Sequence, residues 1–410
     1  MWVKMMLINK NYTKLLSATI ITRIGDSIDT IAFSWLVFIM TGSRALMGGI
    51  FIMSVLPNLI ILPFAGVIAD LFNKKHLVVL SDVFRGVFVL GLAALYFTGI
   101  LQVWHLFAFV FANSIFESVA NPSRTGLIQA IIKSDEYTKG NSYISSGSSF
   151  GSLVGLGIAG ILIGIIGIEG AIFIDAITFF ISALIIGFIN IEHTKKTEDK
   201  QSISLYFKMI KDGFLYLKGK RLLLSLLLLS AIISFMYVPF NVLQPVYVDT
   251  VMNLGVEGLT YLGVSFSTGM IVGGIVIGKV SDKMRSITAI GLGFLMMGVM
   301  YAGLGVVEYF EVGFVLNILI VILLTFSFAF FIPVMHAPVY GTIMKQIPQD
   351  LIGRMMSIFG IFGLVSMPLG GLVVTLIDDS VSVFNLYILM GILIIVMALL
   401  YWIPNRKEEF

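Results

Sequence analysis

The sequence predicts an all-α membrane protein whose twelve transmembrane helices form two pseudo-symmetric six-helix halves. Hydrophobic residues make up 58% of the 410 residues, charged residues make up 12%, and the mean hydropathy is +1.02. Soluble domains average about 25% charged residues. Apolar stretches of about 20 residues, long enough to cross a bilayer core, recur along the whole chain. A Gly-x-x-x-Asp motif followed by basic residues occurs in each half, at Gly66–Asp70 and Gly278–Asp282.

Each apolar segment is expected to be a helix. Membrane strands alternate apolar and polar residues, whereas these segments are apolar on all sides. The predicted spans are 15–40, 46–70, 77–99, 103–131, 143–167, 171–191, 222–248, 258–279, 286–307, 312–344, 352–377 and 382–404.

One long polar segment, 192–221, separates the two halves. It predicts an N-terminal six-helix half at 1–191 and a C-terminal six-helix half at 222–410. Its second part, from Leu205 to Lys218, has apolar residues at helical spacing and lysines on the other face. This pattern is typical of an amphipathic helix on the inner leaflet. The alternative is a solvated linker that orients the protein by its charge.

Basic residues are distributed unevenly between the two sets of loops. Arg44 is the single base among acidic loop residues such as Glu169 and Glu308, while the opposite loops hold nearly all other loop Lys and Arg. Cytoplasmic loops carry the excess of Lys and Arg in membrane proteins. We therefore expect a multi-pass protein of the cytoplasmic (inner) cell membrane with both termini in the cytoplasm.

Polar side chains within the membrane fall on the first and fourth span of each half. Ionisable groups are costly in a bilayer, so they usually face a cavity or a partner. We therefore expect a central aqueous cavity lined by these four helices. The candidate residues for proton coupling or substrate binding are Asp26, Asp29, Glu117, Arg23, Arg124, Asn113, Asn121, Tyr237, Asn241, Gln244 and His336.

The carboxylates of this set are the candidate proton-coupling or cation-recognition group. At about 1.5 Å per residue, Asp26, Asp29 and Glu117 lie near mid-membrane, with Arg23 and Arg124 nearer the cytoplasm as counter-ions. A carboxylate balanced between desolvation and a nearby arginine can gain or lose a proton as the cavity opens to either side. The alternative is that Arg23–Asp26 and Glu117–Arg124 are structural ion pairs.

Other intramembrane polar residues have simpler interpretations. His336 could titrate near neutral pH, although a histidine bonded to a helix carbonyl is more common. Asp175 is more typical of a helix-packing hydrogen bond than of a site. The pair Asp82–Arg85 lies near the cytoplasmic end of its span and is assigned to a gate.

Glycines recur every four residues in the 143–167 span, at Gly147, Gly151 and Gly155. Such spacing allows two helix backbones to approach closely. We interpret the run as a seam on which one half could rock against the other.

Several short stretches together resemble the major facilitator superfamily. They are Gly25-Asp26 before Trp35, Pro63 before the Gly66–Asp70 motif, Asp82-x-x-Arg85, Ile174-Asp175 before Phe179, and Gly353-Arg354. Over nearly its whole length the chain is similar to the drug- and siderophore-exporter branch, which includes macrolide-efflux and enterobactin exporters.

The resemblance implies a cytoplasmic gate between the second and third spans, with Asp70 packed against the start of the 352–377 span. Carried over to this sequence, the gating residues are Gly66, Asp70, Lys74, Lys75, Asp82, Arg85, Asp282 and Arg354. The sequence departs from the family pattern in two segments. Leu71, Phe72 and Asn73 precede the lysines, and Leu156 stands where the antiporter motif has a proline.

These observations predict a secondary active transporter that works by alternating access. We expect a proton-coupled exporter, an antiporter, of amphipathic organic compounds such as drug-like molecules or siderophores. The alternatives are a lipid or lysolipid transporter, a metal-ion transporter with Asp26 and Asp29 as oxygen ligands, and a sensor that transports nothing.

An enzyme is not expected, because the sequence has no cysteine and no recognisable soluble domain, nucleotide loop or metal cluster. The expected partners are a small amphipathic substrate, protons and membrane lipid. A monomer without cofactor, metal or nucleic acid is predicted.

Overall fold

The computed structural model describes residues 10–133, 136–190, 215–217, 219–280, 284–310, 313–348, 351–377 and 381–405. Within these ranges, eleven helices are long and apolar enough to cross a membrane. One of them, α6 (Tyr137–Gly187), consists of two helices that meet at Gly167. Counting both parts of α6 gives the twelve spans predicted from the sequence.

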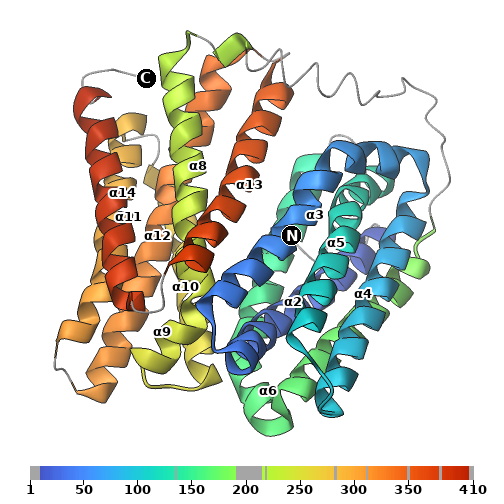
Figure 1. Ribbon diagram of the computed structural model, residues 1–410. Coiled ribbons are helices and arrows are strands. Elements are labelled where there is room, and N and C mark those ends of the chain that lie inside the picture. The colour runs from blue at the N-terminus through green and yellow to red at the C-terminus, as the bar shows by residue number, and fades with distance from the viewer. Residues whose placement is uncertain are drawn as a thin grey trace. The chain divides into compact units, whose positions relative to one another are not determined.

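The helices follow the order of the predicted spans (Figure 1). Before the polar segment they are α2 (Lys10–Thr41), α3 (Arg44–Leu71), α4 (Lys74–Phe97), α5 (Val103–Ile131) and α6. After it they are α8 (Arg221–Val242), α9 (Gln244–Thr250), α10 (Val256–Val280), α11 (Ser286–Val306), η3 (Val307–Tyr309), α12 (Phe314–Gln346), α13 (Ile352–Leu376) and α14 (Val383–Asn405). Most of the predicted amphipathic segment, 205–218, lies outside the described residues.

Two boundaries differ from the prediction for local reasons. The two parts of α6 are joined by a tight turn at Gly167, whose φ of 76° is readily adopted only by glycine. The predicted 222–248 span is interrupted at Leu243, where α8 ends and the short α9 begins with Pro245 in its first turn. Proline suits a first turn because it has no N–H to leave unpaired.

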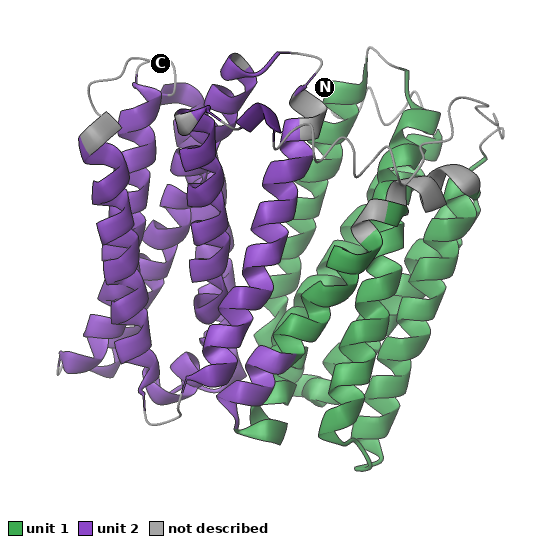
Figure 2. Cartoon of the chain, turned by 45° about the horizontal axis from the view of Figure 1, so that its top comes forward, with its two compact units in different colours: residues 1–42, 50–206 green, residues 43–49, 207–410 purple. Residues whose placement is uncertain are grey.

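The chain forms two compact units (Figure 2). The first unit contains residues 1–42 and 50–206, and the second contains residues 43–49 and 207–410.

The same helix pairs pack inside both units, as a pseudo-symmetric repeat requires. In the first unit, α6 packs on α2 so closely that a Cβ added to Gly151 or Gly155 would collide with a carbonyl oxygen of α2. In the second unit, Gly370 of α13 packs on α8 against the carbonyl oxygen of Phe235. The helices that pair are the first and fifth spans of each half.

The third and sixth spans also pair in each unit. Gly86 of α4 faces Ala176 and Phe180 in the second part of α6. In the second unit, Gly298 and Gly305 of α11 lie against the backbone of α14.

The prediction that Gly147, Gly151 and Gly155 form a seam between the two halves is wrong. These glycines face α2 of their own unit, where Gly147 packs against side chains and Gly151 and Gly155 allow the two helices to touch backbone to backbone. Their spacing specifies a flat helix face, but it contains no information about which helix packs on it.

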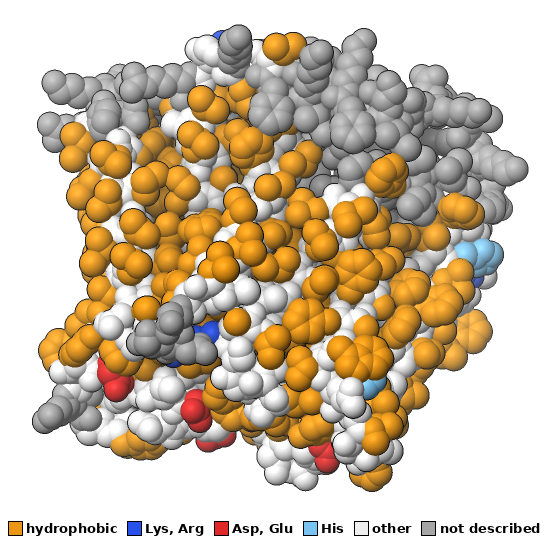
Figure 3. Space-filling view, viewed as in Figure 1, with side chains coloured by type: hydrophobic (Ala, Val, Ile, Leu, Met, Phe, Trp, Pro, Cys, Tyr) orange, Lys and Arg blue, Asp and Glu red, His pale blue; other side chains and the backbone are white. Residues whose placement is uncertain are grey.

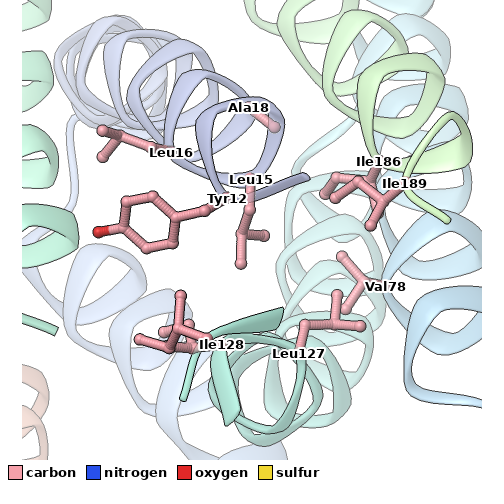
Figure 4. Packing of buried hydrophobic residues seen from close by; sticks show 10 residues of the cluster. Tyr12, Leu15, Leu16, Ala18, Val78, Leu127, Ile128, Ile186 and Ile189 are labelled. Carbon is pink, nitrogen blue, oxygen red and sulfur yellow. The ribbon is translucent and has the colours of Figure 1, made fainter. Parts of the chain in front are cut away.

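A hydrophobic core joins four helices of the first unit (Figure 4). Its buried side chains come from α2, α4, α5, α6 and the residues directly after α5 and α6: Tyr12, Leu15, Leu16, Ala18, Val78, Leu127, Ile128, Ile132, Ile186 and Ile189. The Tyr12 hydroxyl donates a hydrogen bond to the Gly140 carbonyl oxygen at 2.8 Å, so the one polar group of this core is satisfied.

Large apolar side chains also cover the outside of the helices. Phe97 is 79% exposed, Ile165 75% and Leu400 65%. On the face shown in Figure 3, hydrophobic side chains spread over the described surface, while the acidic ones lie near its lower edge. A surface of this kind fits a lipid environment, because soluble proteins rarely expose apolar patches of such extent.

Candidate functional site

Arg85 of α4 contacts three other helices of the first unit. Its Nη2 donates to Asp26 Oδ1 on α2 at 3.0 Å, and its Nε donates to Asn113 Oδ1 on α5 at 2.9 Å. The guanidinium also lies over the Phe179 ring of α6, with 4.2 Å from Cζ to the ring centroid. Because Arg85 is only 7% exposed, these contacts replace water around its charge.

A second ion pair joins α4 to α5 and α6. Arg124 Nη2 donates to both carboxylate oxygens of Asp82, at 2.6 Å and 2.7 Å. The Ser182 hydroxyl of α6 donates to Asp82 Oδ2 at 2.7 Å. Asp82 is fully buried, and its charge is balanced by Arg124.

Two further carboxyl groups, those of Asp175 and Asp29, lie near Arg85. Asp175 of α6 is 1% exposed and accepts a 3.3 Å hydrogen bond from the Thr178 hydroxyl. Gly25 of α2 makes room for the side chains of Asp175 and Thr178, because a Cβ added at Gly25 would collide with them. Asp175 interacts electrostatically with Asp26, Asp29 and Arg85. We call Asp26, Asp29, Asp175 and Arg85 the carboxylate cluster.

The Asp29 carboxylate has an unusual environment. Its Oδ1 is buried and has no hydrogen-bond partner among the described residues. A buried acceptor without a donor costs free energy, so native proteins rarely contain one. A proton on this carboxyl group, or a bound cation, would relieve that cost.

The carboxylate cluster has an excess of acidic groups. Three carboxyl groups share one guanidinium, and adding the neighbouring Glu117 and Arg23 still leaves two more acids than bases. Two uncompensated charges in a low-dielectric interior are strongly disfavoured. The arrangement can therefore hold protons or a cation, which is the chemistry of a coupling site.

The predicted ion pairs are only partly correct. Arg23, 40% exposed, lies 3.5 Å from Asp26, which is a weak contact. Arg124 pairs with Asp82 and not with Glu117. Glu117 and Arg124 are seven residues apart, about 10 Å along the helix, whereas the carboxylate of Asp82 on α4 lies directly against Arg124.

Asp82 and Arg85 do not pair with each other, contrary to the prediction. Each binds a residue of another helix, because side chains three residues apart on one helix can still point to different neighbours. In the rest of the α5 stripe, Asn113 binds Arg85, Glu117 is half-buried, and Asn121 is exposed.

The predicted gate is described only in part. Lys74 begins α4, and its side chain lies against Gly126 of α5. Asn73 caps α4, since its Oδ1 accepts from the backbone N–H groups of Lys75 and His76 at 3.0 Å and 3.4 Å. This cap gives a structural role to Asn73, one of the three residues that precede the lysines. Asp282 and the side chains of Asp70 and Arg354 lie outside the described residues. The gating role of these residues and of Gly66 therefore stays a prediction.

The second unit contains an apolar cavity of about 290 Å³ between α8, α10, α11, α12, α13 and α14. Its lining has four methionines, three phenylalanines and four isoleucines. Three polar residues, Ser234, Tyr237 and His336, complete the lining. The cavity thus contains two of the residues that the sequence singled out for binding, Tyr237 and His336.

The other predicted residues of this unit, Asn241 and Gln244, do not line that cavity. Asn241 Nδ2 donates to the Tyr237 hydroxyl at 3.4 Å. Gln244 begins α9 and therefore does not continue the polar stripe of α8. The predicted aqueous cavity shared by both halves involves both units and stays a prediction.

Sequence reasoning assigned Asp175 to helix packing with Thr178 and Ser182 on the same face, and the bond between Thr178 and Asp175 agrees with it, but the contact of Ser182 with Asp82 was missed. An acidic residue inside a membrane span is by default a candidate for function, and this signal was present for Asp175. Its neighbours on α2 could not be inferred, because the contact between α2 and the second part of α6 is long-range.

Comparison with known proteins identifies the family. Residues 15–371 match the family described as the Major Facilitator Superfamily. The chain is 24% identical to macrolide efflux protein A of Streptococcus pyogenes, over 90% of this chain and 89% of that protein. It is 23% identical to the staphyloferrin A transporter of Staphylococcus aureus, over 95% of each.

Solved structures show the same fold. The nucleoside transporter NupG superimposes with a TM-score of 0.75 at 13% identity, covering 97% of this chain and 100% of that one. These relatives are transporters and not enzymes. The chain therefore belongs to the major facilitator superfamily of membrane transporters, in the branch of drug-efflux and siderophore-transport proteins.

Proposed function

We propose that the protein is a proton-coupled antiporter that exports amphipathic organic compounds by alternating access. The observation that carries this proposal is the carboxylate cluster, where carboxyl groups outnumber guanidiniums and the buried Oδ1 of Asp29 has no partner among the described residues. The macrolide-efflux and siderophore-transporter relatives support the class of cargo.

In the proposed cycle, protons compensate the excess charge of the cluster in one state of the transporter. Protonation of Asp26 would weaken its 3.0 Å contact with Arg85, while Asn113 and Phe179 keep the guanidinium in place. The α2–α4 contact would then be weakened and the α4–α5 contact kept. Such a change is a local event that can bias a two-state rearrangement.

The proposed topology places the gates on the cytoplasmic side. Both termini and the 192–221 segment lie in the cytoplasm, because the loops on that side carry most of the Lys and Arg. The six-helix halves 1–191 and 222–410 move as the alternating elements. Asp70 with Arg354, and Asp282 in the other half, form the cytoplasmic gates.

A metal ion is not the favoured cargo. Within the described ranges, no group of three or more His, Cys, Asp or Glu side chains is placed to hold a metal ion. The acidic and basic groups of the first unit instead form ion pairs and carboxyl contacts.

Flux through proteoliposomes tests the proposal. With the lumen acidified relative to the outside, erythromycin should accumulate in vesicles that contain the wild-type protein. Asp26→Asn should abolish the response to the pH gradient, whereas the matched variant Asp249→Asn, at an exposed position of α9, should keep it. Flux that ignores the gradient, or that survives Asp26→Asn unchanged, would rule out the proposed coupling.

A further inference from the structure

The apolar cavity of the second unit has the features of a binding site. We propose that it takes an uncharged apolar part of the transported compound, of about the volume of two fused rings, and that Tyr237 and His336 bond one polar substituent of that part. This assignment names the cargo of the proposed export function and so depends on that function.

The volume of the cavity limits the size of its occupant. An apolar cavity of about 150 Å³ accommodates benzene. The 290 Å³ available here therefore suits a group of about twice that size. A whole macrolide or siderophore is much larger, so only one apolar part of such a molecule can enter.

The lining determines the charge of the occupant. His336 is the only one of the fourteen lining residues that can carry a charge near neutral pH, and most of the others are Met, Phe and Ile. A charged group would lose its water without gaining an ionic partner, which costs several kcal/mol. The group that enters is therefore uncharged.

One wall of the cavity is held firmly and the rest can adapt. Phe266 and Phe328 pack against Phe240, with ring centroids 5.9 Å and 5.1 Å apart. The four methionines have flexible thioether chains that make favourable contacts with aromatic rings. This combination favours a ring but tolerates variation in its outline.

Two hydrogen-bonding groups in the cavity remain available. The Tyr237 hydroxyl accepts from Asn241, which leaves its own proton free to donate. His336 has no hydrogen-bond partner among the described residues, and its ring stacks against Tyr340 at 5.9 Å. A ligand hydroxyl could accept from Tyr237 and bond the imidazole at once. Ser234, by contrast, already donates to the Ser230 carbonyl oxygen.

Binding of small probes to the purified full-length protein tests the assignment. 1-Naphthol has two fused rings and one hydroxyl, and 1-naphthalenesulfonate has the same rings with a permanent charge. Equilibrium dialysis against protein-free micelles should show saturable binding of 1-naphthol, with the sulfonate weaker by at least about tenfold. Equal affinity for the two probes would overturn the proposal.

Variants locate the binding. Met270→Trp should fill the cavity and weaken 1-naphthol binding by about tenfold or more, since Met270 lines it and is 39% exposed. Met344→Trp is the matched control, because Met344 is 54% exposed and does not line the cavity. His336→Leu should lower the affinity for 1-naphthol but not for naphthalene, and His336→Gln should restore it. Unchanged 1-naphthol binding by Met270→Trp would contradict the assignment.

The same variants separate this proposal from the proposed function. If pH-driven export proceeds normally in Met270→Trp, the cavity assignment fails and the export function stands. If 1-naphthol binds as expected but no gradient drives export, the export function fails and the cavity remains a binding site.

Discussion

At the scale of single residues, Arg85 holds α4 to three neighbours through one charged side chain. It bonds Asp26 and Asn113 and lies over the ring of Phe179. Removing one member of a buried ionic network leaves the other charges without partners, which costs more than the pair itself contributes.

Arg85→Ala should therefore lower the free energy of unfolding by about 3–5 kcal/mol. Arg23→Ala is the control, because Arg23 is 40% exposed and contacts Asp26 only at 3.5 Å. Its effect should stay below about 1 kcal/mol. Thermal or denaturant unfolding in one detergent measures both. Similar losses for the two variants would show that Arg85 does not organise the cluster.

The Asp82–Arg124 pair gives a second prediction at this scale. Arg124→Leu leaves the fully buried Asp82 with only Ser182 as a donor, whereas the double variant Asp82→Leu/Arg124→Leu leaves no charge behind. The double variant should be more stable than Arg124→Leu by about 1–3 kcal/mol. A double-mutant cycle of unfolding measures the coupling, and additive losses would contradict the pairing.

Single residues show where reading the sequence succeeds and where it stops. Asp26 and Asp29 could be found because a charge in an apolar span is conspicuous. Their partners could not, because sequence spacing relates residues only along one helix. The contacts Asp26–Arg85 and Asp82–Arg124 both join different helices, 59 and 42 residues apart.

At the scale of the helices, close packing of α6 on α2 depends on glycines that face a carbonyl of the other helix. A Cβ at Gly155 would collide with the carbonyl oxygen of Ile24, while one at Gly164 of the same helix would meet nothing within 4 Å. The two glycines therefore have different roles although their sequence contexts look alike.

Gly155→Leu should destabilise the protein by about 1–3 kcal/mol or more, because the helices must separate to fit the side chain. Gly164→Leu should change the stability by less than about 0.5 kcal/mol. The melting temperatures of the two variants, measured under the same conditions, test the difference. Equal melting temperatures would contradict the close contact of α6 with α2.

The twelve spans were predictable because each is a long apolar run of its own. The break between α8 and α9 was less visible, since only Pro239 and Pro245 mark it. The partner of the glycine face was not predictable, because the same spacing suits contact with any helix.

At the scale of the whole molecule, two kinds of chemistry occupy different units. The described intramembrane ion pairs lie in the first unit, and the apolar cavity lies in the second. The pseudo-symmetric repeat of helix pairs is thus shared, while the side chains on it are not. Sequence patterns revealed the polar stripes in both halves but not the apolar cavity, which depends on six helices at once.

This division predicts that coupling and binding can be altered separately. Asp26→Asn should lower the affinity for 1-naphthol by clearly less than the roughly tenfold expected for Met270→Trp, because the cavity contains no residue of the cluster and the two sites are linked only through the state of the transporter. Dialysis with 1-naphthol measures this directly. A loss of affinity as large as that expected for Met270→Trp would show that the two sites are not separate.

The central claim is that the carboxylate cluster holds protons that leave when cargo binds. The most direct measurement is the pH change of a weakly buffered solution of purified protein when a compound carried in the flux assay is added. Release of protons by the wild-type protein, and its loss in Asp26→Asn/Asp29→Asn with cargo binding retained, is the result predicted here. Binding of cargo without proton release, or equal release by the double variant, would contradict the claim.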